Sequence, residues 1–560
     1  MRKIIHRADL FHKFEISLVM AFLPGVFLLV LLNPSPGINS VETLPSTEML
    51  QAYAYAMPAS GWSPLTVYFS AFGSLGGTGS SLRYEWDLDG NGRYDTDSTQ
   101  SGGYVSYLYK KPGDYTITLK VTDELGNSAT DQVSVRVRYP GSSSVDYWTI
   151  FDDSQVQRVE VHISQENWDM IWQDPSAKVR VETDISLFGE ELQAVAVSLK
   201  GNASMDAPGE KKSWKVDINY YLTNQEFHNL KQLLFNNNYA DASLLRDKMA
   251  YDMMAFAGVP AGHASFVEFW VDIVDDELEP EYLGIYTMVE RVDSKFVSNR
   301  FDRDQGVGNL YKADGYFEQG AADLAYYGES IEGYPMPRGE VAYGLQTNLD
   351  TPDYSGIINL CRVIDGVEYA STDDFASALE EVFNVDGYLR YLAVIFTNLN
   401  LDTYPYTGNN FYLYENPATG RIEFLPWDLN ESWGLFWGDA IFPFYGEPRR
   451  IGPLEWAPLF TRVFEVPEYR QDYTAYVDLL LRHWFNAENV GRQVSAWQSL
   501  LGPHLTRSTG DRMYIGTDAM FSLEDFYQDG QEIITLTSAR AEYLRDFLAS
   551  GQWRTDIPES

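Results

Sequence analysis

Two aspartates in the second half of the chain, Asp402 and Asp428, stand on either side of a predicted β-hairpin. Residues 410–414 and 422–425 have strand-like composition and are separated by a turn. In an antiparallel hairpin the start of the first strand lies beside the end of the second, so both acids and Asn410 are expected at one end. Carboxylates grouped in this way can hold Mg²⁺ or Mn²⁺, whose sites combine one or two carboxylates with phosphate oxygens. The alternative is that Asp402 caps a turn and Asp428 begins a loop, but the apolar flanks favour the metal site.

A close group of lysines in the first half of the chain has the chemistry to hold phosphate. Lys200 and Asn202 lie in a glycine-containing turn, and Lys212 and Lys215 lie on the predicted strand that follows. A nucleotide phosphate needs a point charge together with backbone N–H donors. Lys215 is the first candidate for the phosphate contact and Lys212 the second. The choice stays open because Lys212 shares a face of an alternating strand with Trp214, and a solvated Lys-rich face is the alternative for the whole group.

Two further charged residues, Arg246 and Glu290, lie in otherwise apolar sequence. A buried glutamate usually needs a cationic partner. A Lys–Glu pair is one way to fix a phosphate-binding lysine, so Glu290 is the predicted partner of that lysine. Arg246 is assigned to the same nucleotide-binding group.

An oxygen-rich loop nearer the N-terminus matches part of a calcium-binding pattern. Asp87, Asp89, Asn91 and Asp95 follow the spacing of the first nine positions of such a loop. Ser98 stands where the bidentate glutamate of an EF-hand belongs, and predicted strands flank the loop, so an EF-hand is excluded. Ca²⁺ binding is one expectation, and a solvated hairpin turn is the other.

The elements that must position these residues can be predicted from hydrophobic periodicity. A buried helix that ends just before Asp402 has apolar residues spaced by four, three, four and three positions, at Val385, Leu389, Leu392, Phe396 and Leu399. Further strands are predicted at 159–164, 179–187, 266–273 and 282–289, and further helices at 244–256, 469–485 and 538–548. A β-rich first half followed by a more helical second half favours two lobes over a sandwich or a barrel.

Composition restricts the class of protein and its partners. The chain carries 41 Lys and Arg against 80 Asp and Glu, a net charge of −39 that repels nucleic acid. Its one cysteine, Cys361, excludes an intramolecular disulfide and Cys-rich metal sites. Aromatic residues make up 15% of the chain, which supplies enough material for packed cores.

The N-terminus predicts export. Basic residues precede an uncharged apolar run at 16–32, which is long for a signal-peptide core and short for a membrane-spanning helix. Both interpretations place the rest of the chain outside the cytoplasm, secreted or anchored to the outer face of the membrane. The predicted segments are a signal peptide or anchor (1–33), a linker (34–50), a β-sandwich (51–138), a second linker (139–150) and a large α+β body with a helical C-terminal part (151–560).

Residues 51–138 resemble a PKD domain. The resemblance rests on 84–90 (YEWDLDG), 111–119 (KPGDYTITL) and 121–123 (VTD), and it covers nearly the whole segment. It implies an immunoglobulin-like all-β sandwich that serves as a spacer or an adhesive unit in exported proteins. A surface polysaccharide or protein is the partner expected for such a unit.

The larger body resembles the CotH kinase family, the atypical kinases of bacterial spore coats. The matching segments, in order, are 200–204 (KGNAS), 211–215 (KKSWK), 233–238 (LLFNNN), 243–248 (SLLRDK), 282–293 (YLGIYTMVERVD), 308–312 (GNLYK), 409–414 (NNFYLY) and 426–430 (PWDLN). The resemblance implies a divergent two-lobed kinase fold that binds ATP between its lobes, with Asp402 and Asp428 at the family's two catalytic positions. Lys200 replaces a common Arg, which loses bidentate contact with phosphate, and Asn430 replaces a frequent Asp.

These observations predict an exported protein kinase that transfers the γ-phosphoryl group of ATP to Ser/Thr residues of a surface or coat protein. Asp428 is expected to bind the metal, and Asp402 to orient the acceptor hydroxyl or to help hold the metal. A non-catalytic adhesin with a kinase-like binding module is the main alternative. A two-carboxylate hydrolase of polysaccharides is a third possibility, but it leaves the lysine group without a purpose.

Overall fold

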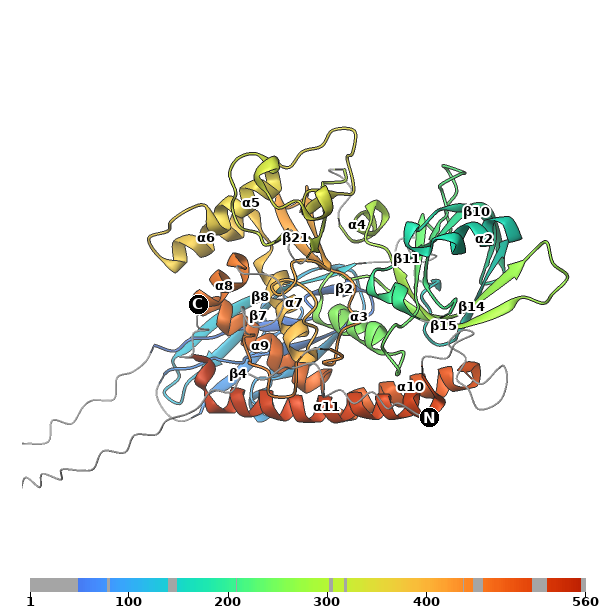
Figure 1. Ribbon diagram of the computed structural model, residues 1–560. Helices are drawn as coiled ribbons and strands as arrows, with labels where there is room; N and C mark the ends of the chain where they lie inside the picture. The colour runs from blue at the N-terminus through green and yellow to red at the C-terminus, as the bar shows by residue number, and fades with distance from the viewer. Residues whose placement is uncertain are drawn as a thin grey trace, which may run out of the picture. The chain divides into compact units, whose positions relative to one another are not determined.

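The computed structural model describes residues 49–77, 81–138, 149–207, 209–301, 306–316, 320–436, 438–446, 457–505 and 521–554 (Figure 1). The predicted signal or anchor segment and the two predicted linkers lie almost wholly outside these ranges. None of the helices within the described ranges is long and apolar enough to cross a membrane.

The N-terminal domain is all-β, as predicted. One sheet has the order β1-β3-β6, from Tyr55–Met57, Leu65–Ser70 and Val105–Tyr109. The other has the order β2-β8-β7-β4-β5, from Ser60–Trp62, Ser128–Arg138, Gly113–Thr122, Arg83–Asp87 and Thr96–Asp97. Alternating residues of β7 meet Trp86 and Phe69 in a shared core, since every second side chain of a strand points to the same face.

The first half of the larger body closes into a barrel of seven strands. Its order is β10-β11-β12-β13-β15-β14-β9, from Val181–Leu187, Glu190–Lys200, Ser213–Asp217, Gln232–Asn236, Glu281–Glu290, Ala264–Ile273 and Gln157–Ile163. The barrel contradicts the expectation that no barrel would form. Closure depends on the parallel pairing of β9 with β14, while the six other pairs are antiparallel. The interior is apolar and includes Val159, Val161 and Ile163 of β9.

The second half of the body is mixed and mostly helical. Its helices are α4 (Ser294–Arg300), α5 (Ser355–Asp365), α6 (Thr372–Val382), α7 (Val385–Asn398), α8 (Pro458–Glu465), α9 (Pro467–His483), α10 (Ala487–Leu505) and α11 (Leu523–Ser550). Helices α2 (Gln165–Gln173) and α3 (Arg246–Ala257) lie between barrel strands in the sequence. A four-stranded sheet has the order β19-β16-β20-β21, from Tyr343–Leu345, Leu310–Ala313, Phe411–Asn416 and Arg421–Pro426. Two short strands, β17 (Gly315–Tyr316) and β18 (Gly320–Ala321), pair with each other.

The predicted hairpin and the predicted helix before it are both present. β20 pairs antiparallel with β21, and Phe411 lies opposite Pro426 at the open end of the hairpin. Helix α7 is buried along most of its length and ends at Leu399, which caps it with a positive φ of 60°. The chain therefore turns at the end of α7, and residues 399–410 connect the helix to the hairpin.

Residues 48–560 form one compact unit, and strand β1 of the N-terminal domain shares the core of the larger body. The Tyr55 hydroxyl donates to Asp472 of α9 at 3.1 Å, and Arg390 of α7 donates to the carbonyl oxygen of Ala56 at 2.9 Å. Met57 is fully buried in the same core. The N-terminal domain thus contributes side chains to the packing around α7 and α9.

Leu392 tests the importance of α7 for stability. Its side chain is 0% exposed at the centre of the helix, so Leu392→Ala is expected to cost about 2–5 kcal/mol of unfolding free energy through lost burial and a residual cavity. Thermal unfolding followed by circular dichroism measures the effect. Leu278→Ala is the matched control, because Leu278 is 75% exposed and should leave the midpoint nearly unchanged. Equal midpoints for the two variants would contradict a core role for α7.

Candidate functional site

Asp402 and Asp428 face each other at the open end of the hairpin. Asp402 follows the C-terminus of α7, and Asp428 follows the end of β21 with a positive φ of 55°. Burial raises the pKa of Asp402 to about 6, with a further contribution from the Asp428 carboxylate. The effect of Asp428 on Asp402 requires the two carboxylates to be close in a poorly solvated place.

Asn410 holds Asp402 in position. Its amide Nδ2 donates to Asp402 Oδ2 and to the Asp402 carbonyl oxygen, both at 2.8 Å. Asn410 itself has a positive φ of 58°, and its carbonyl accepts from the backbone N–H of Trp427, one residue before Asp428. The amide oxygen of Asn410 is the atom of this side chain suited to a metal, since metals of this class prefer oxygen.

Glu431 adds a third carboxylate that the sequence analysis missed. Burial raises its pKa to about 8, and the charges of Asp402 and Asp428 add to the shift. The available signal was its place three residues after Asp428 in the same loop. Glu431 directly follows Asn430, the position at which the CotH pattern often has an acid.

Lys200 faces this acidic group from the end of β11. Its ammonium group donates to Asn236 Oδ1 at the end of β13, and Asn236 Nδ2 donates to Asp247 Oδ2 at 2.6 Å. Burial lowers the pKa of Lys200, and the carboxylates of Asp428 and Asp247 oppose that shift. Burial and the Asp428 charge raise the pKa of Asp247 to about 7. The structure therefore brings Lys200 together with Asp428, and it adds Asn236 and Asp247, which were not predicted.

The other two candidate lysines bind groups in their own neighbourhood. Lys215 forms an ion pair with Asp217 at 2.9 Å, two residues further along β12. Lys212 donates to the carbonyl oxygen of Met205 at 2.9 Å and to that of Ala207. Asn202 accepts from Lys178 Nζ at 3.2 Å in the turn that follows β11.

The expected Lys–Glu pair is wrong, because Glu290 pairs with an arginine. The Arg300 guanidinium of α4 donates to Glu290 Oε1 at 2.8 Å and to Oε2 at 2.6 Å, and the backbone N–H of His263 donates to Oε2 at 3.1 Å. Glu290 is 0% exposed, so its charge requires a partner. Helix α4 supplies that partner ten residues later, which the strand pattern could not indicate.

Arg246 forms ion pairs with two aspartates, Asp241 and Asp529. Its guanidinium donates to Asp241 Oδ1 at 2.6 Å and makes a two-pronged contact with Asp529, at 2.6 and 2.8 Å. These contacts tie the start of α3 to α11. The next residue, Asp247, is the one that reaches the acidic group at the hairpin.

The proposed calcium loop is organised by one aspartate. Asp87 Oδ1 accepts from the backbone N–H groups of Gly90 and Asn91 at 2.9 and 3.1 Å, and Oδ2 accepts from Gly92 at 2.8 Å. Asp89 accepts from the Asn91 N–H at 3.2 Å, while Asp95 accepts from Thr96 Oγ1 at 3.4 Å. Such contacts are typical of an Asx-stabilised turn, the second of the two expectations, and calcium binding stays a prediction.

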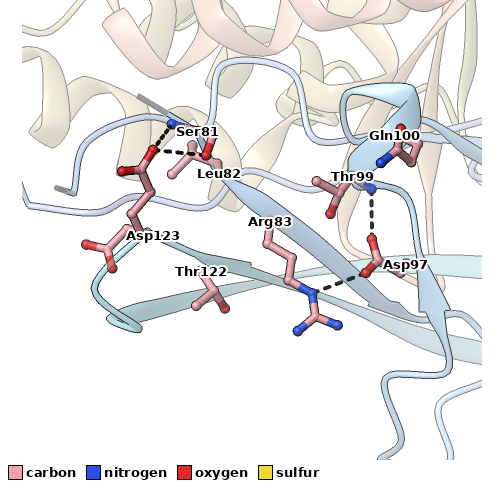
Figure 2. Close-up of a pocket in the computed structure, with 9 residues that line it drawn as sticks. Ser81, Leu82, Arg83, Asp97, Thr99, Gln100, Thr122 and Asp123 are labelled. Carbon is pink, nitrogen blue, oxygen red and sulfur yellow. Dashed lines mark hydrogen bonds and ion pairs between the residues drawn. The ribbon is translucent and has the colours of Figure 1, made fainter. Parts of the chain in front are cut away.

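A pocket of about 500 Å³ lies on the N-terminal domain (Figure 2). Arg83 Nε donates to Asp97 Oδ2 at 3.1 Å, and Asp97 Oδ1 accepts from the backbone N–H of Thr99 at 2.9 Å. Ser81 donates to Glu124 from both its backbone and its hydroxyl. The remaining lining residues are Leu82, Gln100, Thr122 and Asp123. Three carboxylates against one guanidinium make this lining acidic.

The raised pKa of Glu431 predicts how stability changes with pH. Its ordinary value is 4.5 and its folded value is about 8, so protonated Glu431 stabilises the fold fully below about pH 4.5. This contribution is lost as the pH rises towards 8. Glu431→Gln cannot ionise, so without divalent cations the variant should lose less thermal stability than the native protein between pH 5 and pH 9. Unfolding midpoints across that range measure the difference. Parallel slopes for the two proteins would contradict the raised pKa, and exposed Glu465→Gln is the control for a general charge effect.

Family models match both parts of the chain. A CotH kinase protein model matches residues 197–547, and a PKD domain model matches residues 56–137. The solved PKD1 domain of Vibrio anguillarum Epp is 26% identical, with coverage of 17% of this chain and 99% of that one and a TM-score of 0.14. The PKD1 domain of Vibrio cholerae metalloprotease PrtV is 31% identical, with coverage of 15% and 93% and a TM-score of 0.12.

Similar curated proteins come from a bacterium and a fungus. Inner spore coat protein H of Bacillus subtilis (strain 168) is 24% identical over 61% of this chain and 84% of that protein. Invasin CotH7 and invasin CotH3 of Rhizopus delemar are 22% and 21% identical, over 47% and 62% of this chain. The matches span only 41% and 58% of those invasins. Since the CotH model matches more than half of the chain, this protein belongs to the CotH kinase family, with a PKD domain preceding the CotH region.

Proposed function

We propose that this protein is an exported, metal-dependent kinase that transfers the γ-phosphoryl group of ATP to Ser/Thr hydroxyls of a surface or coat protein. The observation that carries the proposal is that Lys200 lies near Asp428, whose carboxylate in turn lies near Asp402. An ammonium group and a set of carboxylates facing one another suit a phosphate chain with its bound metal. Spore coat and invasin relatives support an exported, surface-associated setting.

The donor set fits a divalent cation. Burial raises the pKa values of Asp402 and Glu431, and the Asp428 carboxylate raises both further, so a cation among the three carboxylates relieves a repulsion already present. Asp428 and Asn410 Oδ1 are the proposed Mg²⁺ or Mn²⁺ ligands, and Glu431 supplies a further carboxylate. Such a metal, when bound, neutralises charge on the phosphates and aligns them for in-line transfer.

Lys200 takes the phosphate-binding role in this proposal. Lys215 and Lys212 are occupied by Asp217 and by carbonyl oxygens, whereas Lys200 faces Asp428. Asn236 fixes the ammonium group, which replaces part of the geometric control that a forked arginine would provide. The Asp247 carboxylate, which accepts from Asn236, balances part of the positive charge of Lys200.

Asp402 is the proposed acceptor for the proton of the attacking hydroxyl. The hydroxyl oxygen forms the new bond to the γ-phosphorus, the bond to the β–γ bridging oxygen breaks, and ADP leaves with that electron pair. A carboxylate with a pKa of about 6 is ionised at neutral pH and is a stronger base than an ordinary aspartate. Asn410 orients it through the 2.8 Å hydrogen bond.

An adhesin is the second candidate function. The acidic pocket of the PKD domain offers a surface for a polysaccharide or protein partner, and two relatives are named invasins. Incubating the full chain with labelled ATP and Mn²⁺ separates the candidates. Autophosphorylation supports the kinase, sugar release from surface polysaccharide supports a hydrolase, and neither outcome favours the adhesin.

Asp428→Asn tests the metal ligand. The variant keeps the size of the side chain but removes a charge that binds the metal, so Mn²⁺-dependent ATP affinity should fall at least about tenfold with the fold intact. Calorimetric titration with ATP and Mn²⁺ measures the change. Asp350→Asn, in an exposed turn, is the control and should bind ATP normally. Unchanged affinity in Asp428→Asn would remove Asp428 from the metal site.

Asp402→Asn tests the proton acceptor. Asn keeps the shape but cannot take a proton, so turnover should fall roughly 10²-fold or more while ATP affinity is retained. Paired titrations and rate measurements on Asp402→Asn and Asp428→Asn distinguish the two roles. Equal loss of ATP affinity in both variants would make Asp402 a metal ligand, and full activity in Asp402→Asn would return it to a turn-capping residue.

A further inference from the structure

A histidine and two carboxylates gather on the outer face of the barrel, at its parallel seam. His162 and Glu160 alternate with the buried valines of β9, so both side chains point away from the barrel interior. Asp272 of β14 lies directly opposite His162 in the parallel register. One ligand atom from each of these three side chains lies within 4.8 Å of the others.

The imidazole of His162 lies between a hydroxyl oxygen on one side and two carboxylates on the other. The Ser186 hydroxyl of β10 donates to Glu191, so its oxygen is free to accept from His162 Nε2, which lies 3.0 Å away. On the other side of the ring, His162 Nδ1 lies 3.0 Å from Asp272 Oδ2 and 3.9 Å from Glu160 Oε1. A cation placed among these three atoms is attracted by both carboxylates.

Arg158 holds the Glu160 carboxylate in place by binding the oxygen that does not face His162. The guanidinium binds Glu160 Oε2, with Nε at 2.8 Å, and its central carbon lies 4.2 Å from the centre of the Trp270 ring. Oε1 is left pointing at the imidazole. Partners that hold ligand side chains in this way are a regular part of metal sites, as is an oxygen acceptor for the second imidazole N–H.

We propose that His162 Nδ1, Asp272 Oδ2 and Glu160 Oε1 bind a divalent transition metal, with Zn²⁺ as the best-matched ion. Zn²⁺ takes imidazole nitrogen and carboxylate oxygen at about 2.0–2.2 Å, which places neighbouring ligand atoms about 3–3.5 Å apart. The measured separations of 3.0 and 3.9 Å lie around that range. The three side chains are 22%, 26% and 15% exposed, in the order His162, Asp272, Glu160, so solvent can reach the site and complete the coordination.

The metal would join the two strands on which closure of the barrel depends. β9 and β14 are about a hundred residues apart in the sequence and form the barrel's parallel pair. A ligand that binds the folded state alone stabilises it in proportion to the logarithm of its concentration over its dissociation constant. Zn²⁺ at this seam therefore raises barrel stability, independently of the site at Asp402 and Asp428.

Zn²⁺ titration of the metal-free full chain tests this site, with excess Mg²⁺ present to occupy sites made of oxygen ligands alone. The native protein should bind one equivalent of Zn²⁺ with micromolar or tighter affinity and show a higher unfolding midpoint. His162→Gln and Asp272→Asn should each weaken binding at least about tenfold and remove the midpoint shift. Ser186→Ala, which removes the oxygen beside Nε2 and the hydrogen bond to Glu191 but none of the three ligands, should weaken binding by a smaller factor.

His228→Gln is the matched control, because His228 faces a single carboxylate, Glu190 Oε1 at 2.8 Å. It should leave Zn²⁺ affinity unchanged. Circular dichroism before titration confirms that each variant is folded, and Asp272→Asn provides the test if His162→Gln misfolds. Equal Zn²⁺ affinity in the native protein, His162→Gln and Asp272→Asn would overturn the proposal. Absence of any Zn²⁺-dependent midpoint shift in the native protein would overturn it as well.

Discussion

Repulsion among half-buried carboxylates is the constraint on which the hairpin region depends. Asp402, Asp428 and Glu431 lie close together where solvent screens them poorly, so burial first, and the charges of neighbouring carboxylates second, raise the pKa values of Asp402 and Glu431 to about 6 and 8. Lys200 offsets part of this charge, and Asn236 and Asp247 hold Lys200 in place. The backbone conformation of this region is also uncommon, since Leu399, Asn410 and Asp428 all adopt positive φ. Non-glycine residues hold that conformation only where their surroundings enforce it.

Helix α7 and the hairpin are the rigid neighbours that hold the backbone in this conformation. Helix α7 is buried along nearly its whole length, so its C-terminus fixes the position of the backbone that leads to Asp402. The hairpin fixes the other side, because Asn410 binds Asp402 with its side chain and accepts from Trp427 with its carbonyl. A site on a helix end and a strand end is positioned more accurately than one on a long loop. The same packing extends to the N-terminal domain through Arg390 and Ala56.

Local sequence patterns predicted individual helices and strands, but they did not predict which distant segments pair with one another. The 4-3-4-3 spacing found α7, and the turn between two strand-like runs found β20 and β21, because both signals lie within a few residues. Barrel closure needs β9 to pair with β14, which no local period encodes. The prediction of a lysine partner for Glu290 was wrong for the same reason, since its partner Arg300 lies on the following helix. Asp247 and Glu431 are ordinary in sequence and become notable only when the fold brings them near Asp428.

The energetic cost of this acidic group bears on the choice between an enzyme and a purely adhesive protein. Placing like charges together in a half-buried site destabilises the fold unless a cation is present, and neutral residues of similar shape would remove that cost. An adhesive surface on the PKD domain needs none of these residues. A cation held next to a fixed ammonium group is, however, the arrangement that a phosphate chain requires. The proposed site for a metal with a nucleotide would account for this cost, and adhesion through the PKD domain is compatible with that proposal because it would use a different part of the chain.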